Sequence, residues 1–164
     1  MNTAALLISL LLAAPARESS LRDAARVVVR YLDAVRLAAP RAADRSLPHA
    51  AAYADATRLV APRALAELEA AEARGAEHAL AFWRQAARGR VLETFQLVAV
   101  RRAPGEAAVV TVEERLSSRE RAALVATRSE YLVARIDAEW RVVARRPGGQ
   151  FDDAAVAALE PYWR

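Results

Sequence analysis

Two stretches, EAAVVTVEERL at 106–116 and ATRSEYLVARIDAEWRVV at 126–143, decide the fold of this chain. In both, β-branched apolar residues alternate with polar ones, and this two-residue period is typical of strands that bury one face. The turn signal Asp137-Ala138-Glu139 divides the second stretch. Connections this short join antiparallel neighbours, because parallel strands need crossovers of about a dozen residues or more.

Extended outward, the same pattern predicts a four-stranded antiparallel meander. The alternation begins with VLETFQLVAV at Val91, and the Pro-Gly-Gly at 147–149 ends it. Between these limits, turn residues at 103–106, 117–121 and 137–139 separate the strands. We predict strands at 91–102, 107–116, 123–136 and 140–146.

The residues before the sheet have a helical period. Apolar side chains recur at three- and four-residue steps from Leu21, with Ser19 or Ser20 as a cap, and the pattern stops near Pro40. Asp152 or Asp153 can cap a last short helix. We predict further helices at 50–59, 63–74, 77–88 and 154–159. The fold class is therefore α+β: N-terminal helices packed on a curved four-stranded antiparallel meander, with a short C-terminal helix.

The N-terminus has the features of a signal peptide. Residues 4–14, AALLISLLLAA, are uncharged and about half as long as a membrane span. Ala14-Pro15-Ala16 fits the small-x-small cleavage pattern. We predict a signal peptide at 1–16, a single domain at 17–164, a periplasmic or secreted location, and no membrane association after cleavage. An uncleaved apolar helix stays open as the alternative, because no Lys or Arg precedes the run.

Composition excludes several classes of function. The chain has no Cys, which excludes disulfides, thiolate metal sites and a cysteine nucleophile. All 24 basic side chains are Arg, and they are interleaved with 20 acidic ones rather than gathered in a block. A GC-rich genome explains the Arg and Ala bias without a functional role, so we expect no nucleic-acid partner.

The helical stretch LVAPRALAELEA at 59–70 and the meander together resemble the nuclear transport factor 2-like superfamily, in particular its small secreted bacterial members. The resemblance covers most of residues 20–146, and AEWRVV is similar to the final strand of such domains. It implies a cone-shaped domain with a cavity. The superfamily's isomerases and dehydratases resemble one another in placing Asp, His or Tyr deep in that cavity, whereas the predicted strands here contain no His, and Asp only at a turn.

Hairpins that are symmetric about their turns place a polar set on one face of the sheet. This face is apolar at one end and polar at the other, as a cavity with a polar mouth would be, so the set is our candidate ligand-binding site. Cross-strand ion pairs on a solvated face are the alternative interpretation. Trp140 is expected to anchor the core, so Trp140→Ala should cost about 3–5 kcal/mol. The candidate residues are Gln96, Glu113, Arg128, Glu130 and Trp140.

These residues support three functional hypotheses. The first is an exported, non-catalytic binding or accessory domain that takes a small-molecule ligand or forms a homodimer through the sheet face. The second is an isomerase- or hydrolase-like cavity enzyme with Glu113 or Glu130 as base. The third is an Arg-rich surface for an anionic polymer.

For the third hypothesis, the meander should bring five arginines to one sheet edge, where we expect intramolecular ion pairs rather than polyanion binding. They are Arg115, Arg119, Arg121, Arg145 and Arg146. We expect no cofactor and no metal, since His49 and His78 lack metal-site spacing.

Overall fold

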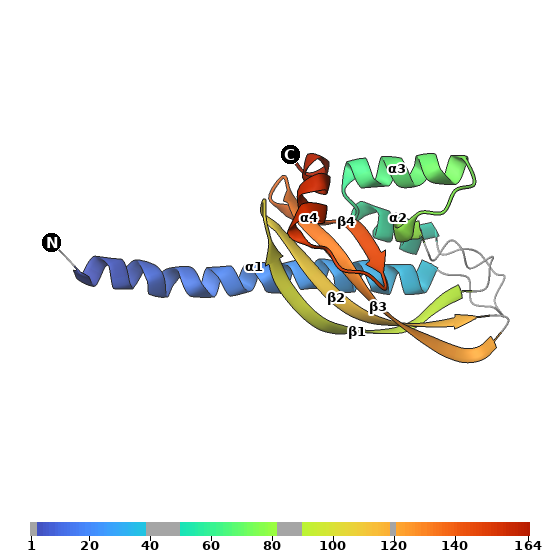
Figure 1. Cartoon of the computed structure of the whole chain (residues 1–164), viewed down its shortest axis with the longest axis horizontal. Coiled ribbons are helices and arrows are strands. Elements are labelled where there is room, and N and C mark those ends of the chain that lie inside the picture. Colours follow the sequence, from blue (N-terminus) through green and yellow to red (C-terminus); the bar gives the residue numbers. More distant parts are fainter. Residues whose placement is uncertain (1–2, 39–49, 82–89, 119–120) are drawn as a thin grey trace.

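The protein, seen in a computed structural model that describes residues 3–38, 50–81, 90–118 and 121–164, is built of helices, then a sheet, then a short helix (Figure 1). This order confirms the predicted α+β class. The elements are α1 (Thr3–Ala38), α2 (Ala50–Arg58), α3 (Pro62–Ala73), η1 (Ala79–Ala81), β1 (Arg90–Ala103), β2 (Ala107–Ser118), β3 (Arg121–Ile136), β4 (Glu139–Pro147), α4 (Asp153–Leu159) and η3 (Glu160–Tyr162).

The four strands form one antiparallel sheet in the order β1-β2-β3-β4, and each strand lies within two residues of its predicted bounds at both ends. The sheet is strongly curved (Figure 1). Gly105 and Glu106 of the β1–β2 turn have φ of 72° and 58°, so the tight turn uses the left-handed region that the Pro-Gly signal favours.

The β3–β4 turn is shorter than the sequence suggests. Asp137 and Ala138 both have positive φ, at 50° and 67°, as in a two-residue hairpin turn. Ile136 therefore pairs with Glu139, and Arg135 with Trp140. A register shift between Leu132 and Val133 restores the predicted pairing further along, where Glu130 pairs with Arg146. A second shift lies between Leu97 and Ala99 of β1, and beyond it Val100 pairs with Val110.

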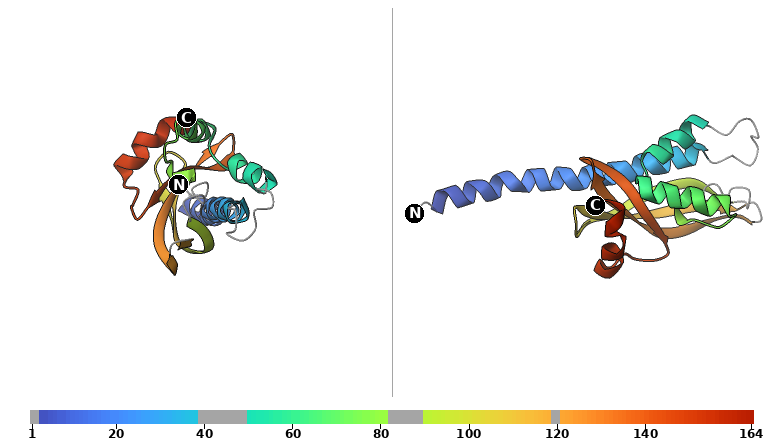
Figure 2. Two further views of the ribbon diagram at one scale, coloured as in Figure 1. Left: turned by 90° about the vertical axis from the view of Figure 1, so that its right-hand side faces the viewer. Right: turned by 90° about the horizontal axis from the view of Figure 1, so that it is seen from above.

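Helix α1 crosses one face of the sheet and contacts all four strands. Its inward residues Val28, Leu32 and Val35 are fully buried, as the helical period predicts. The rings of Tyr31 and Tyr131 meet edge to face, with centroids 6.1 Å apart. The N-terminal part of α1 projects beyond the sheet (Figures 1 and 2). The helix is continuous from Thr3, so the predicted cap at Ser19 or Ser20 is wrong: both residues lie inside α1.

The C-terminal segment covers part of the other face of the sheet. Phe151 and Val156 are buried, and the Arg146 guanidinium lies 4.7 Å from the centre of the Phe151 ring. Asp152 caps α4, accepting a hydrogen bond from the Ala155 amide at 2.7 Å, which confirms one of the two predicted caps. Trp163 Nε1 donates to the carbonyl of Gly105 at 2.8 Å, so the last residues reach the β1–β2 turn.

A short backbone pairing covers the β4 edge at Val142. The amide of Val142 donates to the carbonyl of Leu59 at 2.7 Å, and the amide of Ala61 donates to the carbonyl of Val142 at 2.8 Å. Pro62 then starts α3, since a first-turn proline loses no helical hydrogen bond. The predicted helix at 63–74 is confirmed. The one at 77–88 is not confirmed over its described part, where only 79–81 is helical. The rest of that predicted helix and His49 lie outside the described residues.

Candidate functional site

Four of the five candidate residues lie on one face of the sheet, as predicted. Gln96 pairs with Glu113, Glu113 pairs with Arg128, and Glu130 lies two residues further along β3. Trp140 is the exception. The two-residue turn places it opposite Arg135, on the face that packs on α1, so the prediction that it shares a face with Glu113 is wrong.

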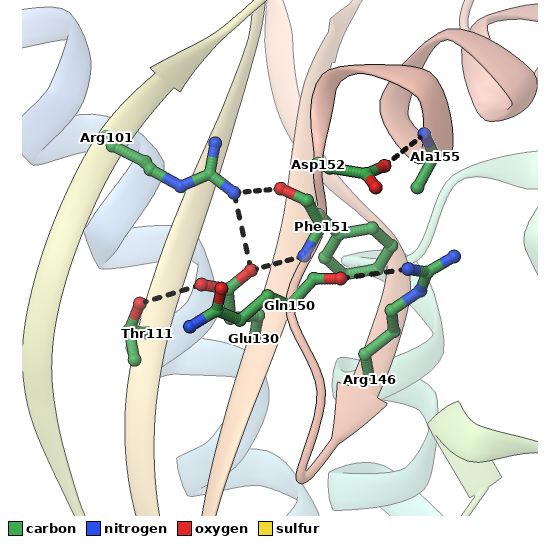
Figure 3. A network of polar contacts seen from close by, with 8 residues as sticks. All are labelled: Arg101, Thr111, Glu130, Arg146, Gln150, Phe151, Asp152 and Ala155. Carbon is green, nitrogen blue, oxygen red and sulfur yellow. Dashed lines mark hydrogen bonds and ion pairs between the residues drawn. The ribbon is translucent and has the colours of Figure 1, made fainter.

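Glu130 holds the C-terminal segment to the sheet (Figure 3). Its Oε2 accepts a hydrogen bond from the Phe151 amide at 2.6 Å and one from Arg101 Nη2 at 3.4 Å, and Arg101 also donates to the Phe151 carbonyl. Thr111 Oγ1 donates to Oε1 at 3.5 Å. The Glu130 side chain is only 9% exposed. These contacts give it a structural role in fixing Phe151.

The remaining polar residues of this face are open to solvent. Gln96 and Arg128 are exposed, and Glu113 pairs with Arg115 across 3.6 Å, with a third of its side chain accessible. Exposed pairs of this kind contribute little to stability. This end of the face therefore fits the solvated-sheet interpretation better than a cavity mouth.

A buried polar cluster, defined here as Glu114, Ser129, Tyr131 and Arg145, lies on the α1 side of the sheet. Arg145 Nε and Tyr131 Oη donate to Glu114 Oε1, the former at 3.1 Å, and Ser129 Oγ donates to Oε2 at 2.8 Å. Arg145 Nη2 also donates to Oε2. Each carboxylate oxygen of Glu114 thus accepts two hydrogen bonds, which fills the acceptor capacity of the group.

Electrostatics in the cluster follow from its burial. Burial raises the pKa of Tyr131 well above its ordinary value, and the neighbouring charge of Glu114 raises it further. Burial alone would lower the pKa of Arg145, but Tyr131 and Glu114 outweigh burial and raise it. Tyr131 therefore stays protonated and Arg145 stays charged.

Sequence reasoning missed this cluster. One signal was present: Glu114 continues the alternation of Val110 and Val112, so it had to share their apolar face.

The prediction that five arginines gather at one sheet edge was also wrong for two of them. Arg145 is in the core and Arg146 packs on Phe151, on the opposite face. Arg119 and the side chain of Arg121 lie outside the described part of the chain.

A groove of about 550 Å³ lies between α1 and the start of β4. Three elements line it: one flank of α1, the end of α2 and the first residues of β4. The Leu59–Val142 backbone pairing holds the end of α2 beside β4, and Arg141 Nη1 donates to the carbonyl of Arg58. The lining residues are Asp23, Arg26, Val27, Arg30, Arg58, Leu59, Glu139, Trp140 and Arg141.

The arginines of the groove differ in their partners. Arg26 pairs with Asp23 at 3.1 Å, Arg58 with Asp55 at 2.7 Å, and Arg141 with Glu139 at 2.5 Å. Arg30 is exposed, and no hydrogen bond or ion pair joins its guanidinium to another described residue.

Two smaller hollows adjoin the groove. One, of about 350 Å³, shares Arg30, Arg58 and Leu59 with it, and the other, of about 260 Å³, shares Trp140. The α1 residues that line the three hollows run from Ser20 to Leu37. At about 1.5 Å per residue, these residues extend over about 25 Å of α1.

His78 has a local partner. Its Nδ1 accepts a hydrogen bond from the Leu80 amide at 3.3 Å, and burial lowers its pKa. Within the described residues, no group of three or more His, Asp or Glu side chains could hold a metal ion.

Comparison with known proteins finds no matching family model, no similar curated protein and no similar solved structure. None of the described helices combines the length and the apolar character that a membrane crossing needs.

Proposed function

We propose that this chain is an exported, non-catalytic small-ligand-binding domain whose site is the groove between α1 and β4. The observation that carries the proposal is the groove itself. Its volume of about 550 Å³ falls in the range of small-molecule sites, and an aromatic side chain, Trp140, lies among four arginines. Six of the nine lining residues are charged, and Val27, Leu59 and Trp140 supply the apolar part, so the charged groups would orient a ligand that packs on this small apolar surface.

The polar face of the sheet is a weaker candidate. Glu130 is occupied by the C-terminal segment, and Glu113 and Arg128 are solvated strand residues. If two copies paired through this face, only the end of the face near Gln96 could form the interface, because Phe151 and Val156 cover part of the rest. Sedimentation equilibrium tests that form of the proposal, and a monomer at all concentrations would contradict it.

The proposal includes membership of the nuclear transport factor 2-like superfamily. Its support is the element order, in which helices precede a curved antiparallel meander, and the position of α1 across one face of the sheet. Export rests on the uncharged run at 4–14 and the Ala14-Pro15-Ala16 site.

A screen of small organic fragments by ligand-observed NMR tests the binding site. Leu59→Trp would fill the groove, and Leu97→Trp on β1 is a matched control, because Leu97 is exposed outside the groove. Hits that Leu59→Trp removes and Leu97→Trp keeps would support the proposal. Hits that survive both variants, or a screen without hits, would contradict it.

A cavity enzyme is the second candidate, and the buried Tyr131–Glu114 pair is the observation in its favour, since perturbed pKa values gather at catalytic sites. Against it, every acceptor position of Glu114 is occupied. Turnover of activated esters or enolisable ketones that Tyr131→Phe abolishes in a folded protein would favour the enzyme.

A further inference from the structure

The charges around the groove restrict the kind of ligand it can hold. Three of the four lining arginines have a carboxylate partner, in Asp23, Asp55 and Glu139. One positive charge, that of Arg30, is left without a counter-charge among the described residues. A single carboxylate would compensate it, whereas a phosphate dianion or a polyanion would need more uncompensated cations than the groove has.

Arg30 occupies the right place to act as an anchor. It lies one helical turn after Arg26 on the same flank of α1, and it lines both the groove and the adjoining hollow of about 350 Å³. Arg58 lines the same two hollows. Asp33 and Asp55 line the adjoining one as well, and their carboxylates pair with Arg36 and Arg58, so Arg30 is the cation left for an added anion. The fork of an arginine matches the two oxygens of a carboxylate.

The apolar part of the lining lies beside these arginines. Trp140 is partly buried, Val27 is almost fully buried, and Leu59 packs against the core. A tryptophan ring held at the wall of a groove offers a flat surface on which a planar group can stack. The arrangement therefore has a cationic end, at Arg30 and Arg58, and an apolar middle beside Trp140.

We infer that the ligand of this groove is a small monocarboxylate with a flat apolar body, whose carboxylate binds Arg30 and whose body packs on Trp140. The inference rests on the proposed function, since it assigns a ligand class to the same groove. It excludes phosphates and polyanions as the preferred ligands.

Calorimetry on the full-length protein with four probes tests the assignment. The probes are 2-naphthoate, the neutral 2-naphthylmethanol, the dianion 2-naphthyl phosphate, and acetate, which lacks the flat body. We expect 2-naphthoate to bind about tenfold more tightly than the alcohol, because a hydrogen bond to a charged group contributes on that order. Acetate should bind too weakly to detect.

Arg30→Gln should reduce the affinity for 2-naphthoate to that for the alcohol and leave the alcohol unchanged. Arg22→Gln is the matched control, because Arg22 is exposed on the same helix but does not line the groove. Equal losses in the two variants, or an unchanged affinity in Arg30→Gln, would overturn the inference. So would tighter binding of the phosphate.

The failure of this inference differs from that of the proposed function. If the alcohol and the carboxylate bind equally and Leu59→Trp removes both, the groove is a site but its ligand is not selected by charge. If no probe and no fragment responds to Leu59→Trp, the proposed function fails as well.

Discussion

Arg145 on β4 and Glu114 on β2 form an ion pair across the intervening strand, with side-chain exposures of 4% and 0%. Arg145 also donates to the carbonyl of Ala79 at 3.2 Å, and Tyr31 Oη donates to the carbonyl of Leu80 at 2.6 Å. The pair and its neighbours thus join three strands to η1 and α1. Two buried charges lose much hydration energy, so the net contribution of the pair to the stability of the fold depends on complete hydrogen bonding.

We expect either half of this pair to be costly to remove alone. Arg145→Met leaves the Glu114 carboxylate buried without its cation, and the free energy of unfolding should fall by about 3–5 kcal/mol. Glu114→Gln should also destabilise the protein, by leaving Arg145 unpaired. The double variant should be less destabilised than the sum of the two, because neither partner is then stranded. Urea titration of all four proteins measures the coupling, and additive losses would contradict a tight pair.

Tyr131 predicts a loss of stability in alkali. Its pKa in the folded protein is raised above the ordinary value of 10.0, so the unfolded chain releases the phenolic proton at a lower pH than the folded protein does. Its contribution is therefore complete below about pH 10 and is lost as pH rises above that value. The slope from this one proton is about 1.4 kcal/mol per pH unit.

Denaturant titrations between pH 8 and about 11.5 measure this slope. Tyr131→Phe should flatten it. Tyr162→Phe is the control, because the pKa of Tyr162 is also raised, through its hydrogen bond to Glu67, but its side chain is far less buried. A slope that persists in Tyr131→Phe would mean that other groups cause the alkaline loss.

Much of the fold was predictable because it rests on local pattern. Alternation and turn residues located all four strands, and the three- and four-residue steps located the core face of α1. The site was less predictable, because the face of a residue depends on every irregularity between it and the turn. Because the turn is one residue shorter than expected, Trp140 lies on the other face of the sheet, and the turn residues Asp137 and Ala138 do not by themselves indicate this.

Contacts between residues far apart in the chain could not be predicted from the sequence either. No local pattern links Phe151 to Glu130, or Leu59 to Val142, since these contacts join residues from separate elements. Glu114 was an exception, because its place in an apolar alternation indicated burial. The sequence did not indicate that the partner of Glu114 is Arg145, which lies two strands away on β4.

Trp140 is now expected to contribute less to stability than a core anchor would. It is partly buried at the groove, so Trp140→Ala should cost about 1–3 kcal/mol rather than the 3–5 of a buried ring, in proportion to the apolar area removed from water. Phe151→Ala provides the comparison, because Phe151 is 1% exposed and should show the full loss. Equal losses in the two variants, measured by urea titration, would show that the Trp140 ring is as buried as Phe151.

Export predicts a shortened chain. The protein produced in a bacterial host should lose residues 1–16 and begin at Arg17, because the apolar run has the length of a signal peptide and ends in Ala14-Pro15-Ala16. Intact-mass analysis of the periplasmic fraction measures this directly. Ala16→Gln should block processing, since the cleavage site requires a small residue. Recovery of the soluble full-length chain from the periplasm would contradict the prediction.

The arginines should give this protein little affinity for nucleic acid. In the sheet, Arg145 forms an ion pair with Glu114, and Arg115 forms one with Glu113. Along the groove, three of the four arginines have an acidic partner. Neighbouring opposite charges cancel the field that a polyanion would meet beyond about 8 Å at physiological salt. We expect binding to DNA or heparin at low salt only, with a shallow dependence of log affinity on log salt concentration. Tight binding at physiological salt with a steep slope would require several phosphate contacts and would contradict this expectation.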